Sequence, residues 1–286
     1  MSYRLGADVE AFLRWVGGAA RVADVQAAGH DRSAVRRALS DGGAVRVSRG
    51  VLALPDADAL AVATVVHGCR ATCLSAARTM GLWTLSDPDE PHLWSIHGRF
   101  PAGCVRHRGP LLGAALPAGG GSGPVVPVLD AVIHTIRCRP PLEALVVAES
   151  AVRLRLLDRR QLAAALPGNR NGAARAVVGR IGDGSESPLE IVARELFVSA
   201  GLRVEPQVSL DGVGRVDLLV EGRVVVELDG FEFHGTSRAA FRRDRRRGNA
   251  AMLGGLPTLR YTYEDVMYDA ERIVDEVLSL ARRGTR

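Results

Sequence analysis

The most constraining feature of this chain is a pair of apolar runs, Val216–Val220 and Val224–Leu228, separated by a short segment centred on Gly222. Apolar runs on either side of a short glycine-containing segment predict a β-hairpin. Each run contains one acid, Asp217 in the first and Glu227 in the second. A carboxylate in an apolar strand is costly unless a positive group pairs with it. We therefore expect these two carboxylates to pair with a positive group in the folded protein.

Side-chain alternation places Val225, Glu227 and Asp229 on one face of the second predicted strand. If the two strands pair as a hairpin, Asp217 lies near Glu227. Clustered carboxylates are the ligands that a hard cation such as Mg²⁺ or Mn²⁺ requires. A bound metal ion can activate water for phosphodiester hydrolysis. The hairpin therefore favours a divalent-metal site as its functional interpretation.

Several motifs follow one another in a specific order through the last part of the chain. Ser187-Pro-Leu-Glu190 comes before the hairpin, Glu227-Leu-Asp229-Gly ends it, His234 follows, and then come Phe241–Asn249 and Leu256–Val266. This order resembles the very-short-patch-repair-like nucleases, which belong to the PD-(D/E)XK superfamily of restriction-type endonucleases. The resemblance implies a restriction-endonuclease-like α/β domain over residues 186–286, with a helix at its start.

The resemblance also implies residue roles. The implied catalytic residues are Glu190, Asp217, Glu227, Asp229 and His234. Of these, Asp217, Glu227 and Glu190 are the implied ligands of Mg²⁺ or Mn²⁺, and His234 assists the attacking water. The chain departs from the family at one point: all 37 basic residues are Arg, and Asp229 stands where the superfamily usually has Lys. The site therefore depends on a His-containing variant, or the domain is catalytically dead.

The implied site residues also have structural interpretations. Ser187 and Glu190 have the spacing of a helix capping box, which leaves Glu190 divided between capping and metal binding. Arg215 lies on the same strand face as Asp217 and is a candidate ion-pair partner for it. Asp229 is also a candidate turn residue that hydrogen-bonds its own backbone.

An arginine-rich segment follows the predicted site and includes Arg242, Arg243, Arg245 and Arg246. Such a run on a helix is commonly a solvated face. Beside a phosphodiester site it would neutralise the DNA backbone. Arginine does not replace a catalytic Lys as a base, because the guanidinium stays protonated.

The beginning of the chain predicts a winged helix-turn-helix over residues 1–56. Helical spacing covers Val9–Val16, Arg21–Ala28 and Arg32–Leu39, the last capped by Asp31, and Val45–Leu54 alternates as a hairpin. A third helix with polar exposed side chains suits the major groove of DNA, and a basic wing suits phosphates. The predicted DNA contacts are Arg32, Ser33, Arg36 and Arg37 on the helix and Arg46 and Arg49 on the wing. The alternative is a solvated amphipathic helix in a structural domain.

Residues 57–166 predict an α/β extension of this block, and residues 167–185 a linker rich in Gly, Asn and Ser. The winged helix, the turn Arg49–Pro55 and the helix Cys73–Gly81 together resemble the AbiEi-type abortive-infection antitoxins. That resemblance implies a DNA-binding, often autoregulatory, N-terminal region.

Charge is distributed unevenly along the chain. Residues 1–185 hold 22 Arg against 15 acids, a net charge of +7, whereas residues 186–286 hold 15 Arg against 17 acids, a net charge of −2. A basic front part favours attachment to double-stranded DNA. The surplus is modest over 185 residues, so it supports a nucleic-acid partner without establishing one.

The four cysteines, Cys69, Cys73, Cys104 and Cys138, contain no C-x₂-C pair. We therefore expect small buried thiols in a reducing compartment. The alternative is a zinc site, since residues four apart share a helix face; its ligands would be His67, Cys69, Cys73 and His107.

No uncharged apolar run is long enough to span a membrane, and the acidic N-terminus does not resemble a secretion signal. We therefore expect a cytoplasmic protein. The sequence predicts a DNA-binding, divalent-metal-dependent endonuclease acting in DNA repair or phage defence. One alternative is a non-catalytic transcriptional regulator or antitoxin with a decayed nuclease domain, and another is a nuclease acting on RNA or nicking damaged DNA. A double-strand cut would need a homodimer or two successive nicks.

Overall fold

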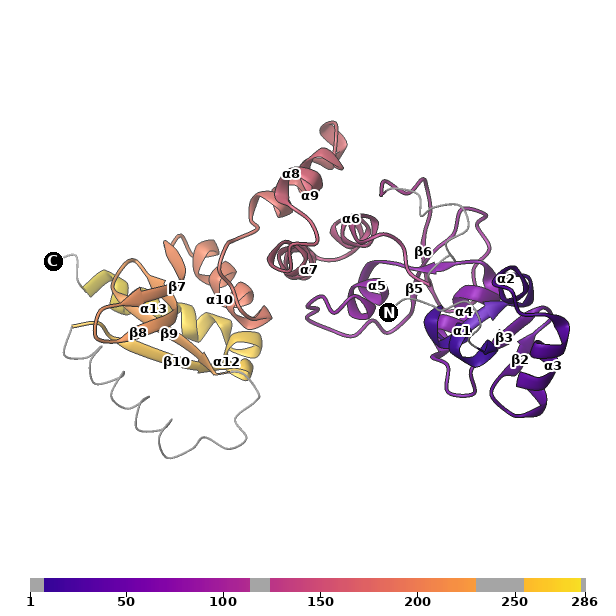
Figure 1. The fold of residues 1–286 in the computed structure, drawn as a ribbon. Helices are drawn as coiled ribbons and strands as arrows, with labels where there is room; N and C mark the ends of the chain where they lie inside the picture. Colours follow the sequence, from indigo (N-terminus) through magenta and orange to yellow (C-terminus); the bar gives the residue numbers. More distant parts are fainter. Residues whose placement is uncertain (1–7, 114–123, 230–254, 284–286) are drawn as a thin grey trace, which may run out of the picture. The chain divides into compact units, whose positions relative to one another are not determined.

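The computed structural model describes residues 8–113, 124–229 and 255–283 of this mixed α/β protein (Figure 1). The chain divides into two compact units, Met1–Gly179 and Arg180–Arg286, which we call the N-terminal and C-terminal units. Their boundary falls inside the segment 167–185 that the sequence predicts to be a linker. In the described part of the chain, every helix is too short or too polar to span a membrane.

The N-terminal unit begins with three helices and a small sheet. Its elements are α1 (Val9–Trp15), β1 (Ala19–Arg21), α2 (Val22–Ala27), α3 (Arg32–Ser40), β2 (Val45–Ser48) and β3 (Val51–Ala53). The three predicted helices and the predicted hairpin are all present. The sheet has the order β1-β3-β2 and is antiparallel, so it gains a strand, β1, that the sequence did not reveal. Three residues are too few to carry a recognisable alternation.

One apolar core holds these elements together. Phe12 and Leu13 of α1, Val25 of α2, Val35 of α3 and Leu52 of β3 are all buried in it. As predicted, Asp31 caps α3, its carboxylate accepting from the N–H of Ala34 at 2.7 Å. Because Val35 is the buried residue of α3, the arginines of that helix face outward.

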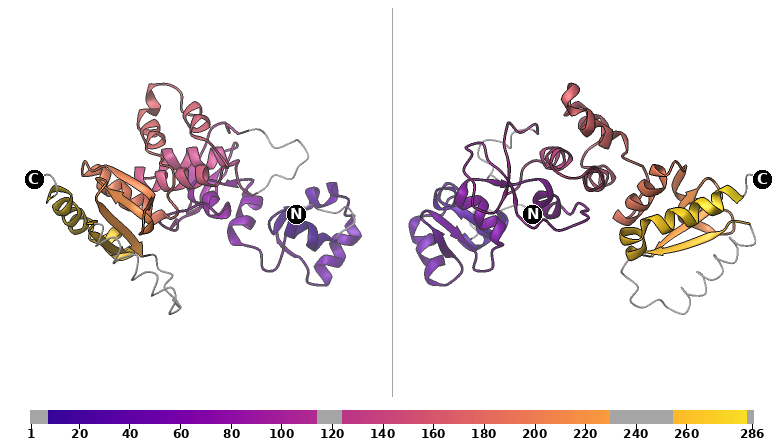
Figure 2. Two further views of the ribbon diagram at one scale, coloured as in Figure 1. Left: turned by 60° about the vertical axis from the view of Figure 1, so that its left-hand side comes forward. Right: turned by 180° about the vertical axis from the view of Figure 1, so that it is seen from behind.

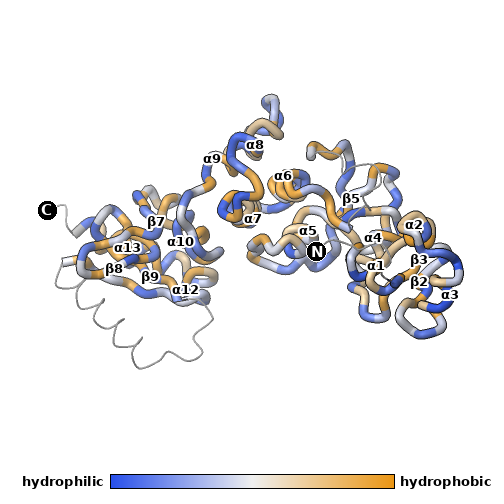
Figure 3. The backbone as a smooth tube through the Cα atoms, viewed as in Figure 1, coloured by the Kyte–Doolittle hydropathy of each residue, from blue (hydrophilic) through white to orange (hydrophobic). Residues whose placement is uncertain are grey.

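The rest of the N-terminal unit is a second small sheet and a series of helices. Its elements are α4 (Ala59–His67), β4 (Arg70–Ala71), α5 (Cys73–Thr79), β5 (His92–Trp94), β6 (Val105–His107), α6 (Val128–Cys138), α7 (Pro141–Arg153), α8 (Arg159–Ala164), the 3₁₀ turn η1 (Asn169–Asn171) and α9 (Gly172–Gly179). In the sheet β5 pairs antiparallel with β4 and parallel with β6. Helix α6 packs between α5 and α7, and apolar residues line α6 and α7 (Figure 3).

The C-terminal unit is a four-stranded sheet covered on one face by helices. Its elements are α10 (Pro188–Ser199), β7 (Val204–Leu210), β8 (Gly214–Val220), β9 (Val224–Asp229), β10 (Thr258–Thr262), α12 (Tyr263–Tyr268) and α13 (Ala270–Arg283). The strand order is β10-β9-β8-β7, with β10 parallel to β9 and the other pairs antiparallel. Helices α10, α12 and α13 contact one another and lie on the same face (Figure 2).

The predicted hairpin is confirmed as β8 and β9. Glu221 and Gly222, at the centre of its turn, have positive φ angles of 53° and 66°, and the N–H of Arg223 donates to the carbonyl of Val220 at 3.1 Å. Two successive positive φ angles define the turn that best matches the twist of a hairpin, and glycine adopts this backbone readily.

Candidate functional site

Glu190 enters the candidate site from the first turn of α10. Ser187 caps this helix as predicted, its hydroxyl accepting from the N–H of Glu190 at 3.2 Å. The Glu190 carboxylate does not complete a capping box; it accepts from the N–H of Glu186 at 2.9 Å. The side chain is only 5 % exposed. Burial, together with the nearby charge of Asp217, raises the pKa of Glu190.

Gln207 joins Glu190 to Asp217. Its side-chain Nε2 donates to Oε2 of Glu190 at 2.9 Å and lies 3.5 Å from Oδ1 of Asp217. The two carboxylates therefore share one amide group. Gln207 has a positive φ of 54° and interrupts the pairing of β7 with β8 between the Pro206–Leu218 and Val208–Val216 pairs. Strained backbone of this kind concentrates at functional sites.

The register of β8 and β9 brings Asp217 beside Glu227. The ladder runs from Val220–Val224 to Leu218–Val226, so Asp217 and Glu227 are the next pair in register. The Asp217 Oδ2 atom accepts from the N–H of Leu228 at 2.8 Å, which fixes this end of the ladder.

Strands β9 and β10 place two more residues of the C-terminal unit, Asp229 and Arg260, in defined register near Glu227. Asp229 is the last residue of β9, and its partner in the parallel strand β10 is Thr262. Arg260 of β10 stands in register with Glu227, so a positive side chain is held on the strand beside that acid. Arg215 forms an ion pair with Glu186 at 2.7 Å.

The three predicted metal ligands, Glu190, Asp217 and Glu227, do not form a compact ligand set. Among the described residues, one group of three or more metal-ligating side chains has its ligand atoms within 4.8 Å of one another, and it lies in the N-terminal unit. The donors around Glu190 and Asp217 are instead Gln207 and backbone N–H groups. All of the predicted acids nonetheless lie on the hairpin or on the helix that contacts it, and carboxylate oxygens are suitable ligands for Mg²⁺ or Mn²⁺.

Comparison of the sequence with models of known protein families and with curated proteins found no match. The two family resemblances therefore rest on the motifs of this chain alone.

Some predicted residues lie outside the described residues. These are His234 and the arginines Arg242, Arg243, Arg245 and Arg246. Conversely, the sequence did not single out Gln207 or Arg260. The available signal for Gln207 was a polar residue between Pro206 and Val208 in an otherwise strand-like segment.

The predicted DNA-contacting residues of the N-terminal unit are all polar and largely exposed. Arg32, Ser33, Arg36 and Arg37 are exposed on α3, and Arg46 and Arg49 are exposed on or beside β2. The Ser33 hydroxyl donates to Asp31 at 2.7 Å and accepts from Arg37 at 3.2 Å. The face of α3 therefore presents two arginines, Arg32 and Arg36, at positions four residues apart.

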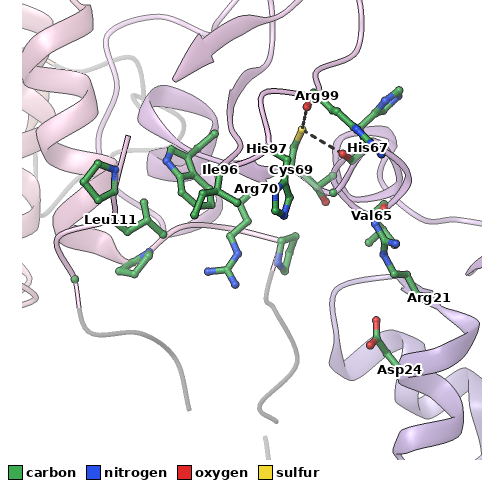
Figure 4. A pocket seen from close by; sticks show the side chains of 17 residues that line it. Arg21, Asp24, Val65, His67, Cys69, Arg70, Ile96, His97, Arg99 and Leu111 are labelled. Atoms are coloured by element: carbon green, nitrogen blue, oxygen red, sulfur yellow. Dashed lines mark hydrogen bonds between the residues drawn. The ribbon is translucent and has the colours of Figure 1, made fainter. Parts of the chain in front are cut away.

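A basic cavity lies elsewhere in the N-terminal unit (Figure 4). It has a volume of about 1160 Å³, and its lining includes Arg21, Arg70, Arg99 and two histidines, with Asp24 as its one acid. None of the predicted catalytic or DNA-contacting residues lines it, but His67 and Cys69 of the alternative zinc set do. Its positive charge suits an anionic partner.

The predictions for the cysteines require correction. Cys69 and Cys73 are buried as expected, but Cys104 is half-buried and Cys138 is exposed. The alternative zinc set is also wrong in two of its members. The ligand atoms of Cys73 and His107 lie together, but the two residues beside them are His92 and Cys138. Cys69 instead donates to the carbonyl of Arg99 at 3.0 Å.

Proposed function

We propose that this protein binds double-stranded DNA through its N-terminal unit and hydrolyses phosphodiester bonds with its C-terminal unit, using Mg²⁺ or Mn²⁺. The proposal assigns a winged helix to the first part of the chain and a restriction-endonuclease-like fold to the C-terminal unit. The sheet order β10-β9-β8-β7, with α10 leading into it, is compatible with that assignment.

One observation carries the proposal. A buried glutamate from α10 and an aspartate from β8 share the amide of Gln207, and Glu227 is next to that aspartate in register. Burying a carboxylate beside a second one is unfavourable unless hydrogen bonds or a cation compensate the charge. Glu190 and Asp217 meet at Gln207 and Glu227 follows in register, and a divalent cation bound there would offset the repulsion between these carboxylates.

The roles of the residues follow from their positions. Asp217 and Glu227 are the proposed ligands, with Glu190 supporting the metal directly or through water. When bound, the metal supplies a more acidic water and stabilises the charge on the phosphate. Gln207 orients the carboxylates of Glu190 and Asp217. We assign His234 to the attacking water because it is the single histidine after residue 186.

The N-terminal unit supplies the DNA attachment in this proposal. Arg32 and Arg36 stand on the exposed face of α3, and Arg46 and Arg49 stand on the hairpin beside it. Helices and hairpins with this charge pattern contact the major groove and the phosphates, respectively.

The test is cleavage of supercoiled plasmid by the purified full chain in the presence of Mg²⁺ or Mn²⁺. We expect metal-dependent nicking or linearisation that Asp217→Ala and Glu227→Ala abolish. Asp211→Ala is the matched control, because Asp211 is an exposed acid in the turn before β8 and should be dispensable. Cleavage that survives Asp217→Ala would refute the proposed site.

The second candidate function is a non-catalytic DNA-binding regulator. The observation that favours it is the occupation of both Asp217 oxygens and one Glu190 oxygen by donors of the protein itself. In that arrangement the acids join α10, β7 and β9 without a metal. Duplex binding by the wild-type chain with no cleavage in either metal would favour the regulator.

A further inference from the structure

Four metal-ligating side chains from four separate elements meet in the N-terminal unit. Cys73 is the first residue of α5, His92 the first of β5, His107 the last of β6 and Cys138 the last of α6. One ligand atom from each lies within 4.8 Å of the other three. The set spans 66 positions of sequence yet converges on one point, which random placement of thiols and imidazoles rarely produces.

Two of the distances between ligand atoms in this cluster are close to those of a tetrahedral zinc site. His92 Nδ1 lies 3.3 Å from His107 Nε2 and 3.8 Å from Cys138 Sγ. With Zn–N bonds of about 2.0–2.1 Å and Zn–S bonds of about 2.3 Å, a tetrahedron places two nitrogens about 3.3 Å apart and a nitrogen and a sulfur about 3.6 Å apart. The observed edges are therefore already close to those of a metal complex.

The surroundings of the cluster orient its ligands. The His107 ring stacks on His134, with centroids 4.9 Å apart, and His134 Nδ1 is held 2.6 Å from the Thr72 hydroxyl. That hydrogen bond occupies one nitrogen of His134, which is not among the four residues whose ligand atoms converge.

A positive group stands beside the two thiols. The Arg139 guanidinium interacts electrostatically with Cys138 and Cys73, and it is held in an ion pair with Glu143 at 2.7 Å.

The sheet in this region has very short strands, although an apolar cluster that includes Trp94 of β5 packs in the same region. Strands β4, β5 and β6 have two, three and three residues, so their ladders supply few hydrogen bonds. Small structures of this kind are commonly stabilised by a disulfide or a structural metal. A metal at the cluster would tie the edge strand β6 and the central strand β5 to both α5 and α6.

We propose that Cys73, His92, His107 and Cys138 bind one structural zinc ion through two sulfurs, Nδ1 of His92 and Nε2 of His107. All four positions of the tetrahedron are filled by the protein, which is the arrangement of structural rather than catalytic zinc. The two thiols release their protons to solvent on binding, so Zn²⁺ and the two thiolates form a neutral centre. The site belongs to the N-terminal unit and does not depend on the acids of the C-terminal unit.

The first experiment measures the metal content of the purified full-length protein by mass spectrometry after gel filtration in metal-free buffer. We expect about one zinc ion per chain. Cys138→Ser and His107→Ala should lose most of it. Cys104→Ser, a cysteine outside the cluster, His134→Ala and Asp217→Ala should retain it. Zinc retention by Asp217→Ala separates this site from the proposed Mg²⁺ site.

Cobalt substitution gives a second readout, and its main result comes from the wild-type protein, so it does not require a variant to fold. Co²⁺ added to the zinc-free wild-type protein should give the strong visible bands of a tetrahedral centre and thiolate charge-transfer absorption in the near ultraviolet, both absent in Cys138→Ser. A wild-type protein that retains no zinc and gives only the weak spectrum of octahedral Co²⁺ would overturn the proposal. Full zinc retention by Cys138→Ser and His107→Ala together would also overturn it.

Discussion

The arrangement of the Glu190 and Asp217 carboxylates depends most on the side chain of Gln207. It divides its amide hydrogens between Glu190 and Asp217 and adopts a positive φ to do so. Its donors compensate part of the cost of burying Glu190. Burial raises the pKa of Glu190, so the neutral form is favoured more strongly in the folded protein than in the unfolded chain.

Glu190→Gln should therefore preserve the fold while abolishing metal-dependent cleavage. Burial raises the pKa of Glu190, so its contribution to stability is present below the pKa of an unfolded glutamic acid and declines as the pH rises through the folded value. Glutamine imitates the neutral acid, and the melting temperature of the variant should equal or exceed that of the wild type. The difference should widen as the pH rises. A melting temperature that falls by several degrees at every pH would contradict this assignment.

Gly182 is a second position at which the stability of the C-terminal unit should be sensitive to a small change, the addition of one Cβ atom. A Cβ atom added there would lie 1.9 Å from Nη1 of Arg194, a buried guanidinium that donates to Ser185 and to Glu195. Gly182→Ala should destabilise the C-terminal unit by about 1–3 kcal/mol, because the guanidinium must leave its partners. Gly179→Ala, whose Cβ meets nothing within 4 Å, is the control. Equal melting temperatures for the two variants would show that Arg194 moves freely.

At the scale of elements, helix α3 is the part of the chain on which DNA binding should depend. Arg36→Ala should weaken duplex binding severalfold and reduce its salt dependence by about one unit of slope, because one phosphate contact is lost. Arg160→Ala on α8 is matched to it, since Arg160 is also an exposed helical arginine. Titrations of labelled duplex at several salt concentrations would measure both. A similar loss of affinity in both variants would mean that DNA binds through net charge alone.

Elements with a strong local signal were predictable from the sequence. The hairpin β8–β9 has two apolar runs and a glycine turn, and α3 has an Asp31 cap and one buried apolar residue, Val35. Strand β1, three residues long, was not predicted, because its pairing with β3 depends on a partner some thirty residues away. Local pattern carries little information about such a strand.

The acids of the C-terminal unit and the Cys/His cluster of the N-terminal unit also differ in how far the sequence could predict them. Asp217 and Glu227 could be placed together because a hairpin register brings them together along one short stretch of chain. Cys73, His92, His107 and Cys138 could not, since each is contributed by a different element. The helix spacing of Cys69 and Cys73 suggested a zinc set that includes two wrong residues, because Cys69 precedes α5 rather than sharing a helix with Cys73.

At the scale of the whole molecule, the two proposed metal sites belong to different units and use different chemistry. Sulfur and imidazole ligands in the N-terminal unit suit zinc, whereas carboxylates in the C-terminal unit suit Mg²⁺ or Mn²⁺. The boundary between Gly179 and Arg180 separates them. Each unit has its own buried core. A change at one site should therefore affect the stability of one unit only.

Differential scanning calorimetry of the full-length protein tests this independence. Two unfolding transitions are expected, one for each unit. In magnesium-free buffer a zinc chelator should lower one transition by several degrees, because a metal bound only to the folded state stabilises it by mass action. Gly182→Ala should lower the other transition, by about 5 °C for each kcal/mol lost in a unit of this size. The two perturbations should add in the doubly treated sample without altering each other. If both shift the same transition, or if the protein unfolds in a single step that both of them move, the two units are thermodynamically coupled and neither site can be assigned to an independent half of the chain.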